Sequence, residues 1–549
     1  MHVTTWIPLL APLAAAYSVP FGTEFARRQL PHEPTGVKTI QTANNVTIRY
    51  KEPGKAGVCE TTPGVNSYAG YVDLAEDAHT FFWFFEARHD PKNAPITLWL
   101  NGGPGSDSLI GLFEELGPCH VNEQLETYIN PHSFNEISNM LFISQPLGTG
   151  FSYATEEVQV VDGHKGRYPA INATLIDTTN LAAEATWEVL QAFLGALPKL
   201  DSNIKSKSFN LWTESYGGHY GPAVSKEPED DLYRFFDHFY KENEKIANGT
   251  VEGIHLDFNT LGIINGIIDE AIQAPHYPEF AVNNTYGIKT VNDTVYNYMK
   301  FANAMPGGCQ DQVASCKATN RTSLSDLAIC TEAADMCRDN GPYYVFSGRG
   351  TYDIRHPSDD PTPPTYYEQY LEKGWVKNAL GVDLNYTGSN NDVYYAFQQT
   401  GDFVWPNFIE DLEDILTRPS ALLLSMVMLI TFATGSVHRH EKEFKAAGYA
   451  PFLVDGVEYG ETREYGNFSF TRVYEAGHEV PYYQPIAALQ LFNRTLNGWE
   501  LPNGLKKLSP GYGSSGPATA THTESSVALP SSTSTPSPSS GVAAMKITW

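Results

Sequence analysis

Residues 209–218 read FNLWTESYGG. The apolar half is typical of a buried strand, and the two glycines favour a sharp turn into a helix. A serine at a tight strand-to-helix turn presents its hydroxyl at the edge of a sheet, the arrangement called a nucleophile elbow. Ser215 is therefore a candidate nucleophile. Because Thr213 takes the first place of the usual G-x-S-x-G pattern, a surface serine in a glycine-rich turn would also fit this stretch alone.

A second glycine-rich turn follows an apolar run upstream, where residues 99–105 read WLNGGPG. Glycines allow backbone N–H groups to approach a ligand closely, which an oxyanion hole requires. A structural turn or a phosphate loop is the alternative. A phosphate loop would carry Gly-Lys-Ser/Thr, and this turn has no lysine.

A histidine near the end of the predicted folded region stands in GHEVP, residues 477–481. Hydrolases with a nucleophile elbow place their base last in the chain, on a loop after the final strand. Any one of the sixteen histidines would mean little alone. With Ser215 and the 99–105 turn, His478 predicts acyl-transfer chemistry.

The surrounding periodicity predicts an α/β fold. Helical periodicity over 177–197 lies between apolar runs, and strand, helix, strand in that order favours a mostly parallel sheet. Residues from 271 to about 400, rich in cysteine and proline, predict an inserted cap, and a helix is expected from about Gln484. The predicted strands are FFWFFEAR from Phe81, ITLWL at 96–100, MLFIS at 140–144, FNLWT at 209–213 and LGIINGII at 261–268.

Four stretches in order, WLNGGPGSDSLIGLFEELGP, PLGTGFSY, WTESYGGHYGP and EAGHEVPYYQP, resemble the serine carboxypeptidase family of fungi and plants, nearest its secreted fungal branch. With GIINGIIDE and the cysteine-rich insertion, the resemblance covers nearly all of residues 45–500. It implies an α/β-hydrolase fold, with a mostly parallel central sheet, helices on both faces and a disulfide-stapled cap. The catalytic domain is expected at 17–507.

The resemblance also implies roles for individual residues, and it implies neither a cofactor nor a metal. Two buried carboxylates close together must share a proton, so the binding of a substrate carboxylate should weaken as the pH rises. The implied residues are Ser215 as nucleophile, His478 as general base and later acid, the backbone N–H groups of Gly103 and Tyr216 as oxyanion hole, and Asn101, Gly102, Glu214 and Glu115 as the binding site of the substrate's terminal carboxylate.

The family's triad aspartate, in a strand-end motif close to YGDADYICNWF, has no match here. Residues 426–436 read MVMLITFATGS instead, and codons for the family motif read one base later encode those eleven residues. We interpret the segment around 421–440 as frame-shifted, with the aspartate expected at Ile430 and the family's cysteine at Ala433. The alternative is a divergent apolar core strand over 421–433. As printed, the chain would lose on the order of 10⁴ in kcat.

One further match to the family and two smaller departures from it concern acidic positions. The Asp402 segment, TGDFVWPNF, matches an earlier part of the family and is not the triad motif. Asp107 stands where small residues are usual, and Ser144 where the family commonly has aspartate before Gln-Pro. The last two affect the expected local packing, not the assignment.

The first sixteen residues predict a signal peptide, since residues 6–16 are apolar but too short to span a bilayer, and small residues at 14–16 suit cleavage. Only His2 is basic before them, which departs from the usual pattern. A secreted protein, with a vacuolar or cell-wall location as alternatives, is also favoured by nine sequons. These are Asn45, Asn172, Asn248, Asn283, Asn292, Asn320, Asn385, Asn467 and Asn493.

Six cysteines permit three disulfides, and their connectivity stays open. Four of them, from Cys309 to Cys337, fall within 29 residues and predict a locally stapled excursion, since zinc sites use closer spacing. Residues 508–549, dominated by Ser, Thr, Pro and Gly, predict a disordered and O-glycosylated tail without a GPI signal.

The expected function is that of a secreted serine carboxypeptidase, which releases C-terminal amino acids from peptides or proteins in acid through an acyl-enzyme. An acyltransferase on the same fold, a catalytically dead glycoprotein and a cell-surface interaction protein are the alternatives. A net charge of −27 disfavours nucleic acid and anionic membranes as partners. No transmembrane helix is expected, and the oligomeric state stays open.

Overall fold

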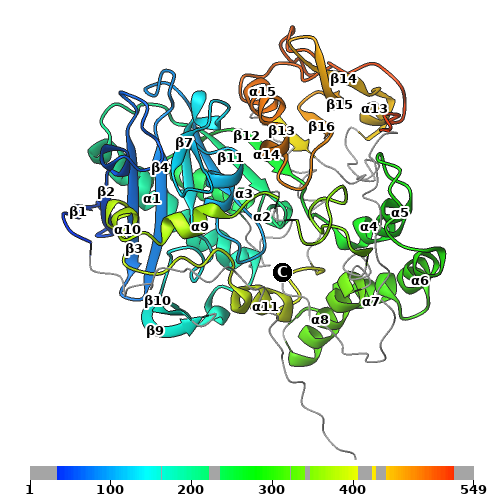
Figure 1. The fold of residues 1–549 in the computed structure, drawn as a ribbon, viewed down its shortest axis with the longest axis horizontal. Coiled ribbons are helices and arrows are strands. Elements are labelled where there is room, and N and C mark those ends of the chain that lie inside the picture. Colours follow the sequence, from blue (N-terminus) through cyan, green and yellow to red (C-terminus); the bar gives the residue numbers. More distant parts are fainter. Residues whose placement is uncertain are drawn as a thin grey trace, which may run out of the picture.

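The computed structural model describes residues 34–161, 164–221, 235–321, 323–339, 347–360, 362–405, 423–427 and 441–524. A twelve-stranded sheet with the order β1-β2-β3-β4-β8-β5-β11-β12-β13-β16-β15-β14 forms its centre (Figure 1). These strands are β1 (Lys38–Gln41), β2 (Thr47–Lys51), β3 (Ser67–Ala75), β4 (Ala78–Phe85), β5 (Ile96–Leu100), β8 (Asn139–Ile143), β11 (Ser208–Glu214), β12 (Asp257–Ile264), β13 (Leu423–Val427), β14 (Ala450–Val454), β15 (Val457–Tyr465) and β16 (Phe468–Val473).

The middle of the sheet is parallel, as the sequence predicts. Strands β8, β5, β11, β12, β13 and β16 run in one direction, and antiparallel strands flank them on both sides. Two small hairpins stand apart, β6 (Cys119–Val121) with β7 (Thr127–Ile129) and β9 (Thr155–Val161) with β10 (His164–Ala170). The carboxyl ends of the parallel strands meet at one edge of the sheet, where ligands bind in open α/β sheets.

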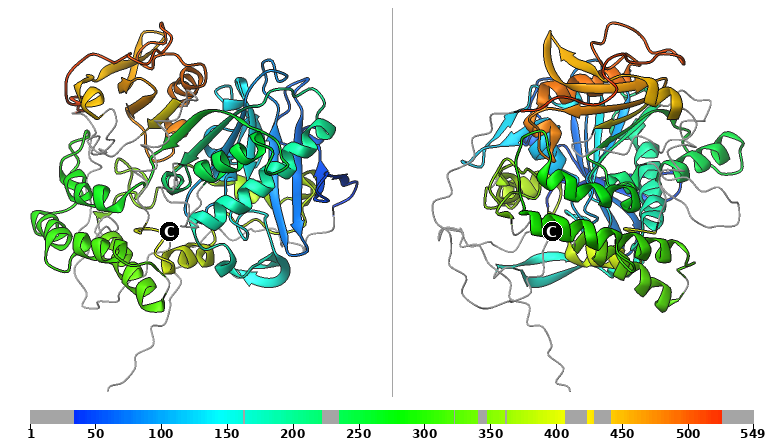
Figure 2. Two further views of the ribbon diagram at one scale, coloured as in Figure 1. Left: turned by 180° about the vertical axis from the view of Figure 1, so that it is seen from behind. Right: turned by 90° about the vertical axis from the view of Figure 1, so that its right-hand side faces the viewer.

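Side chains alternate between two hydrophobic cores along each central strand. Leu98 and Leu211 pack into the core that also contains helix α1 (Thr179–Leu200), whereas Trp99 and Trp212 point into the opposite core with helix α15 (Pro485–Leu496). Figure 2 shows α1 beside α3 (Phe235–Ala247) against one face of the sheet. Burial on both faces explains why these strands read as continuous apolar runs.

The predicted cap is a largely helical insertion between β12 and β13, drawn in green in Figure 1. Disulfides Cys309–Cys337 and Cys316–Cys330 join two of its helices, and Cys59–Cys119 lies outside it. The three disulfides that the sequence permits are therefore present. The helices between β12 and β13 are α4 (Glu270–Gln273), α5 (Tyr277–Val282), α6 (Asp293–Ala304), α7 (Cys309–Lys317), α8 (Leu324–Asp339), α9 (Tyr366–Leu371), α10 (Gly374–Leu380) and α11 (Asn391–Gln399). Of these, α9 and α10 pack into a core of the central sheet.

The chain continues to contact the sheet beyond the boundary predicted at 507. The Ser514 hydroxyl donates to the carbonyl of Gly448 at 2.7 Å, and the ring of His522 stacks on Tyr474 with centroids 3.6 Å apart. The contacts reach at least Glu524, whose backbone N–H donates to the carbonyl of Thr285. Small residues in this Ser- and Gly-rich stretch allow the close approach, because a Cβ on Gly516 would lie 1.8 Å from the carbonyl oxygen of Tyr449.

Some sequence predictions fall outside the described residues, namely the signal peptide at 1–16, tail residues 525–549 and Ile430. Within the described ranges, no helix is both long enough and apolar enough to cross a bilayer.

Candidate active site

Ser215 occupies the sharp turn between β11 and the short helix α2 (Gly217–Tyr220). Its φ of 62° is the left-handed conformation, which is strained for a residue other than glycine. Its backbone N–H donates to the carbonyl of Ile264, and its carbonyl accepts from Ile267. A Cβ on Gly218 would lie 2.4 Å from the Ile267 carbonyl oxygen, so glycine is needed there. The turn has the geometry of a nucleophile elbow.

The turn after β5 lies directly against this elbow. A Cβ on Gly102 would be 2.3 Å from the backbone nitrogen of Tyr216, so the two backbones touch. Gly103 has a φ of 104°, which favours glycine. The structure thus places the turn that contains Gly103 against the backbone of Tyr216, and the sequence predicts an oxyanion hole from these two residues.

His478 lies on the loop after β16, close to the same edge of the sheet. Its backbone N–H donates to the carbonyl of Tyr352 at 2.8 Å, and Asn265 donates to its carbonyl at 2.6 Å. Ser215 and His478 both line one cavity of about 630 Å³, together with Gly103. No hydrogen bond joins the two side chains in the described part of the chain. The three groups on which the predicted chemistry depends converge nonetheless.

Burial alone lowers the pKa of His478 to about 4. Its Nε2 lies 3.9 Å from Oε1 of Glu214. Above about pH 4 the imidazole is therefore neutral, which is the form that accepts a proton as general base. A buried carboxylate beside the imidazole would raise this pKa, because it stabilises the imidazolium.

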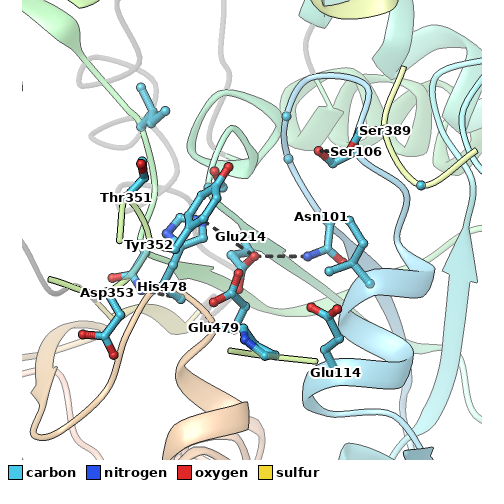
Figure 3. Close-up of a pocket in the computed structure, with 18 of the residues that line it drawn as sticks. Asn101, Ser106, Glu114, Glu214, Thr351, Tyr352, Asp353, Ser389, His478 and Glu479 are labelled. Atoms are coloured by element: carbon cyan, nitrogen blue, oxygen red, sulfur yellow. Dashed lines mark hydrogen bonds and ion pairs between the residues drawn. The ribbon is translucent and has the colours of Figure 1, made fainter. Parts of the chain in front are cut away.

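The Asn101 amide bonds two buried glutamates, and Figure 3 shows it beside Glu214 in the cavity. Its Nδ2 lies 3.1 Å from Oε1 of Glu214 and 3.4 Å from Oε1 of Glu115. Trp99 Nε1 and the N–H of Gly111 both donate to its Oδ1, at 2.7 and 3.0 Å, which fixes the amide with its NH₂ group toward the acids. The sequence predicts these three side chains as one binding group, and the structure brings them together.

The pKa values of both glutamates are raised. Burial raises the pKa of Glu115 to about 7. Burial and then repulsion from Glu115 raise the pKa of Glu214 well above its usual range. Oε2 of each has no hydrogen-bond partner, so a protonated carboxyl here has a free donor for a ligand.

Several acids of this cavity were not predicted from the sequence, among them Glu114 and Glu479. Glu114 and Glu479 line the cavity and directly adjoin the predicted residues Glu115 and His478. Glu114 belongs to a single π-helical turn, η2 (Gly111–Glu115). The periodicity of an α-helix does not predict which way a side chain faces in such a turn. The only available signal was that both residues lie within the quoted motifs, WLNGGPGSDSLIGLFEELGP and EAGHEVPYYQP.

The comparisons with known proteins agree with this geometry. The family model described as serine carboxypeptidase matches residues 53–498. The chain belongs to the serine carboxypeptidase family. The chain is 36% identical to carboxypeptidase S1 homolog A of Arthroderma otae, with 96% of this chain and 87% of that protein covered. It is also 36% identical to carboxypeptidase S1 of Penicillium janthinellum, with 80% of this chain and 97% of that protein covered.

The prohormone-processing carboxypeptidase Kex1 of Saccharomyces cerevisiae has a similar structure. Its TM-score is 0.61 at 20% identity, and 82% of this chain and 95% of that chain are covered. At this identity the likeness concerns the fold, which is that of an α/β hydrolase. The chain is thus a serine-type carboxypeptidase by family, a hydrolase that acts on peptides.

Asp402, whose segment is not the triad motif, has a structural role in this carboxypeptidase. Its Oδ2 accepts from the Tyr216 hydroxyl at 2.7 Å and from the hydroxyl of Thr179 at 2.5 Å, at the start of α1. It anchors the residue after the nucleophile and does not contact His478. Strand β13 pairs in parallel with β12 and β16, so its carboxyl end lies at the edge of the sheet where Ser215 stands. Ile430 follows that strand outside the described residues.

Proposed function

We propose that this carboxypeptidase releases single residues from peptide C-termini through an acyl-enzyme on Ser215. The hydroxyl attacks the scissile carbonyl while His478 accepts its proton, and the backbone N–H groups of Gly103 and Tyr216 stabilise the oxyanion. His478 then protonates the leaving amine, and a water activated by the same imidazole hydrolyses the ester. The convergence of these groups on one cavity supports the proposal.

Selection for a chain end rests on the buried acid pair. A peptide's terminal carboxylate would accept from the Asn101 amide, the N–H of Gly102 and a protonated carboxyl of Glu115 or Glu214. An internal peptide bond has no carboxylate for these donors. Because the shared proton is lost as the pH rises, we expect the enzyme to bind substrates best in acid.

The same site suits an acyltransferase, in which a second nucleophile replaces water. The segment around 421–440, which lacks the triad aspartate, favours a second alternative, a glycoprotein without catalytic activity. We infer that the printed sequence has little activity, since nothing described near His478 takes the place of the triad aspartate. We define the restored chain as this protein with residues 426–436 replaced by YGDADYICNWF.

A blocked dipeptide with a free C-terminus separates these functions. The restored chain should release the terminal amino acid, the printed chain should do so on the order of 10⁴ times more slowly, and Ser215→Ala in the restored chain should abolish release. If neither chain hydrolyses the peptide, the carboxypeptidase proposal fails. Transfer to an added amine or alcohol in preference to water would favour the acyltransferase.

We also propose that the protein is secreted, with a vacuolar or cell-wall location as the alternative. The predicted signal peptide supports this, as do three disulfides, which persist in oxidising compartments. Of the nine sequons, Asn385 is buried and bonded to Glu372, so a glycan there would disrupt the fold. Asn467 and Asn493 are half-buried, and the exposed sequons are Asn45, Asn172, Asn248, Asn283, Asn292 and Asn320.

A further inference from the structure

Asp107 is a buried acid to which the proposed chemistry gives no role. It stands in the turn after β5, between Gly103 of the predicted oxyanion hole and the helical turn η2, and its side chain is fully buried. Neither of its carboxylate oxygens has a hydrogen-bond partner in the described part of the chain. Because a buried carboxylate without partners costs free energy, stability alone does not explain this residue.

The residue lies where three segments of the chain meet. The first is its own turn, and the second is the segment before α11, where the carbonyl of Gly388 accepts from the backbone N–H of Asp107 at 2.9 Å. Figure 3 shows Ser389 of that segment beside Ser106 of the turn. The third segment begins at Ser144, directly after β8. A group at this junction can therefore fix the turn against both the sheet and the insertion.

The side chains of Asp107 and Ser144 border the same small space. A Cβ on Gly150 would lie 2.3 Å from the hydroxyl oxygen of Ser144 and 2.5 Å from Oδ2 of Asp107. Both oxygens therefore stand over the same glycine and are close neighbours. Burial raises the pKa of Asp107 to about 6, and the hydroxyls of Ser144 and Tyr386 oppose that rise because they stabilise the ionised form.

The sequence departs from the family pattern at both of these neighbouring positions. Asp107 stands where small residues are usual, and Ser144 stands where aspartate is common. In either arrangement, one carboxylate and one small side chain would share the space over Gly150. The structure thus connects two departures that lie far apart in the sequence.

We propose that Asp107 is a positioning residue for the predicted oxyanion hole and that its carboxylate takes the place of an aspartate at residue 144. The carboxylate attracts the hydroxyls of Ser144 and Tyr386 to the turn, and it thereby holds the backbone of residues 102–103 against Tyr216. It acts through the N–H of Gly103 and does not touch the substrate. The inference rests on the proposed function, because it assigns a role in that reaction.

The test exchanges the two residues in the restored chain and follows release of the terminal amino acid from a blocked dipeptide. Asp107→Ser should lower kcat by a factor on the order of ten, since the oxyanion donor is displaced and not removed. Combining it with Ser144→Asp should return kcat to within about threefold of the parent, because the two sites are coupled.

The Michaelis constant should change little in these variants. The Asn101 amide, which we propose binds the substrate carboxylate, is fixed separately by Trp99 and Gly111. An effect on kcat without an effect on KM is expected of a group that acts on the oxyanion, which forms only in the transition state.

Two controls separate positioning from general stability. Asp107→Asn keeps the shape of the side chain without its charge, so it should also lower kcat, and it serves if Asp107→Ser does not fold. Asp201→Ser removes another buried aspartate, which ends α1 before the amino end of β11, at the opposite edge of the sheet from Ser215. It should lower Tm but leave kcat of the folded molecules unchanged.

Thermal unfolding of the printed chain tests the pair without catalysis. Ser144→Asp alone places two carboxyls in one buried space, and their repulsion should lower Tm by several degrees. Adding Asp107→Ser should recover that loss. A double variant less stable than Ser144→Asp would show that the two positions do not share one carboxylate, and the inference would be wrong.

The kinetic outcomes separate this inference from the function on which it rests. If the restored chain is active but the exchange leaves kcat as low as Asp107→Ser alone, the positioning role is wrong and the proposed function stands. An unchanged kcat in folded Asp107→Ser has the same meaning. If the restored chain releases no amino acid, the proposed function fails and the inference with it.

Discussion

At the scale of single residues, the site depends on small groups that no larger side chain could replace. Gly102 lies so close to the elbow that an added Cβ would be 2.3 Å from the backbone nitrogen of Tyr216. Gly111 approaches Trp99 in the same way, with a hypothetical Cβ 2.2 Å from its Nε1. These contacts hold in place the backbone of residues 102–103, which we propose as part of the oxyanion hole, and the Asn101 amide.

Gly102→Ala in the restored chain should therefore impair catalysis far more than folding. Displacing an oxyanion donor costs on the order of 10²–10³ in kcat. The matched control is Gly195→Ala in α1, where an added Cβ would meet nothing within 4 Å. Steady-state kinetics on both variants checks this, and equal kcat values for the two would refute the role of the 102–103 backbone.

Glu214→Gln in the restored chain tests whether binding of the substrate carboxylate depends on a protonated carboxyl. The glutamine amide donates at every pH, whereas the native carboxyl pair loses a proton as the pH rises past the pKa of Glu115, which is about 7. We expect KM for a blocked dipeptide to rise from about pH 5 to about pH 8 in the parent and to rise less in the variant. An identical pH dependence of KM in both proteins would count against the shared proton.

At the scale of elements, strand β13 leads into the segment in which the sequence departs from the family motif and the triad aspartate is expected. Its backbone pairs with β12 and β16, so this part of the apolar segment forms a strand even though the family motif is absent. The segment that follows it would carry the acid beside His478. Residues 428–440 lie outside the described ranges.

Replacement of residues 426–436, which yields the restored chain, should raise the pKa of His478 from about 4, because a carboxylate beside the imidazole stabilises its charged form. NMR titration of the imidazole measures this. Ile430→Asn within the restored segment, in place of the aspartate, is the control and should leave the pKa low. An unchanged pKa in the restored chain would show that residue 430 does not contact His478.

The sequence predicts most of these elements because burial leaves a simple pattern. The runs that form β4, β5, β8 and β11 are apolar on both faces. Ser215 and His478 were predicted from the motifs that contain them. Glu114 and Glu479 were missed because no periodicity marks an unpaired acid in a cavity. The contacts of residues 508–524 were missed because they are made by small residues and backbone groups, which resemble a linker in composition.

At the scale of the whole molecule, buried acids set how stability responds to pH. Burial raises the pKa of Glu115 to about 7, of Glu464 to about 8 and of Glu479 to about 8. A carboxyl whose pKa is raised on folding stabilises the fold below its unfolded pKa, and that contribution is lost as the pH rises through the folded value. Folding should therefore weaken from about pH 5 to about pH 8.

Thermal unfolding across this range checks the sign, and Tm should fall by several degrees. Glu115→Gln, which is uncharged throughout, should flatten the part of the decline below about pH 7. A Tm that rises with pH over the same interval would mean that these carboxyls are ionised in the folded protein, contrary to their burial.

The most direct test of the central claim is covalent labelling with a diisopropyl fluorophosphate-type reagent, followed by mass-spectrometric mapping. In the restored chain we predict one modified residue, Ser215, with loss of amino-acid release in proportion to labelling and far slower labelling in the His478→Ala variant. A label on another serine, or release that persists when Ser215 is fully modified, would contradict the account.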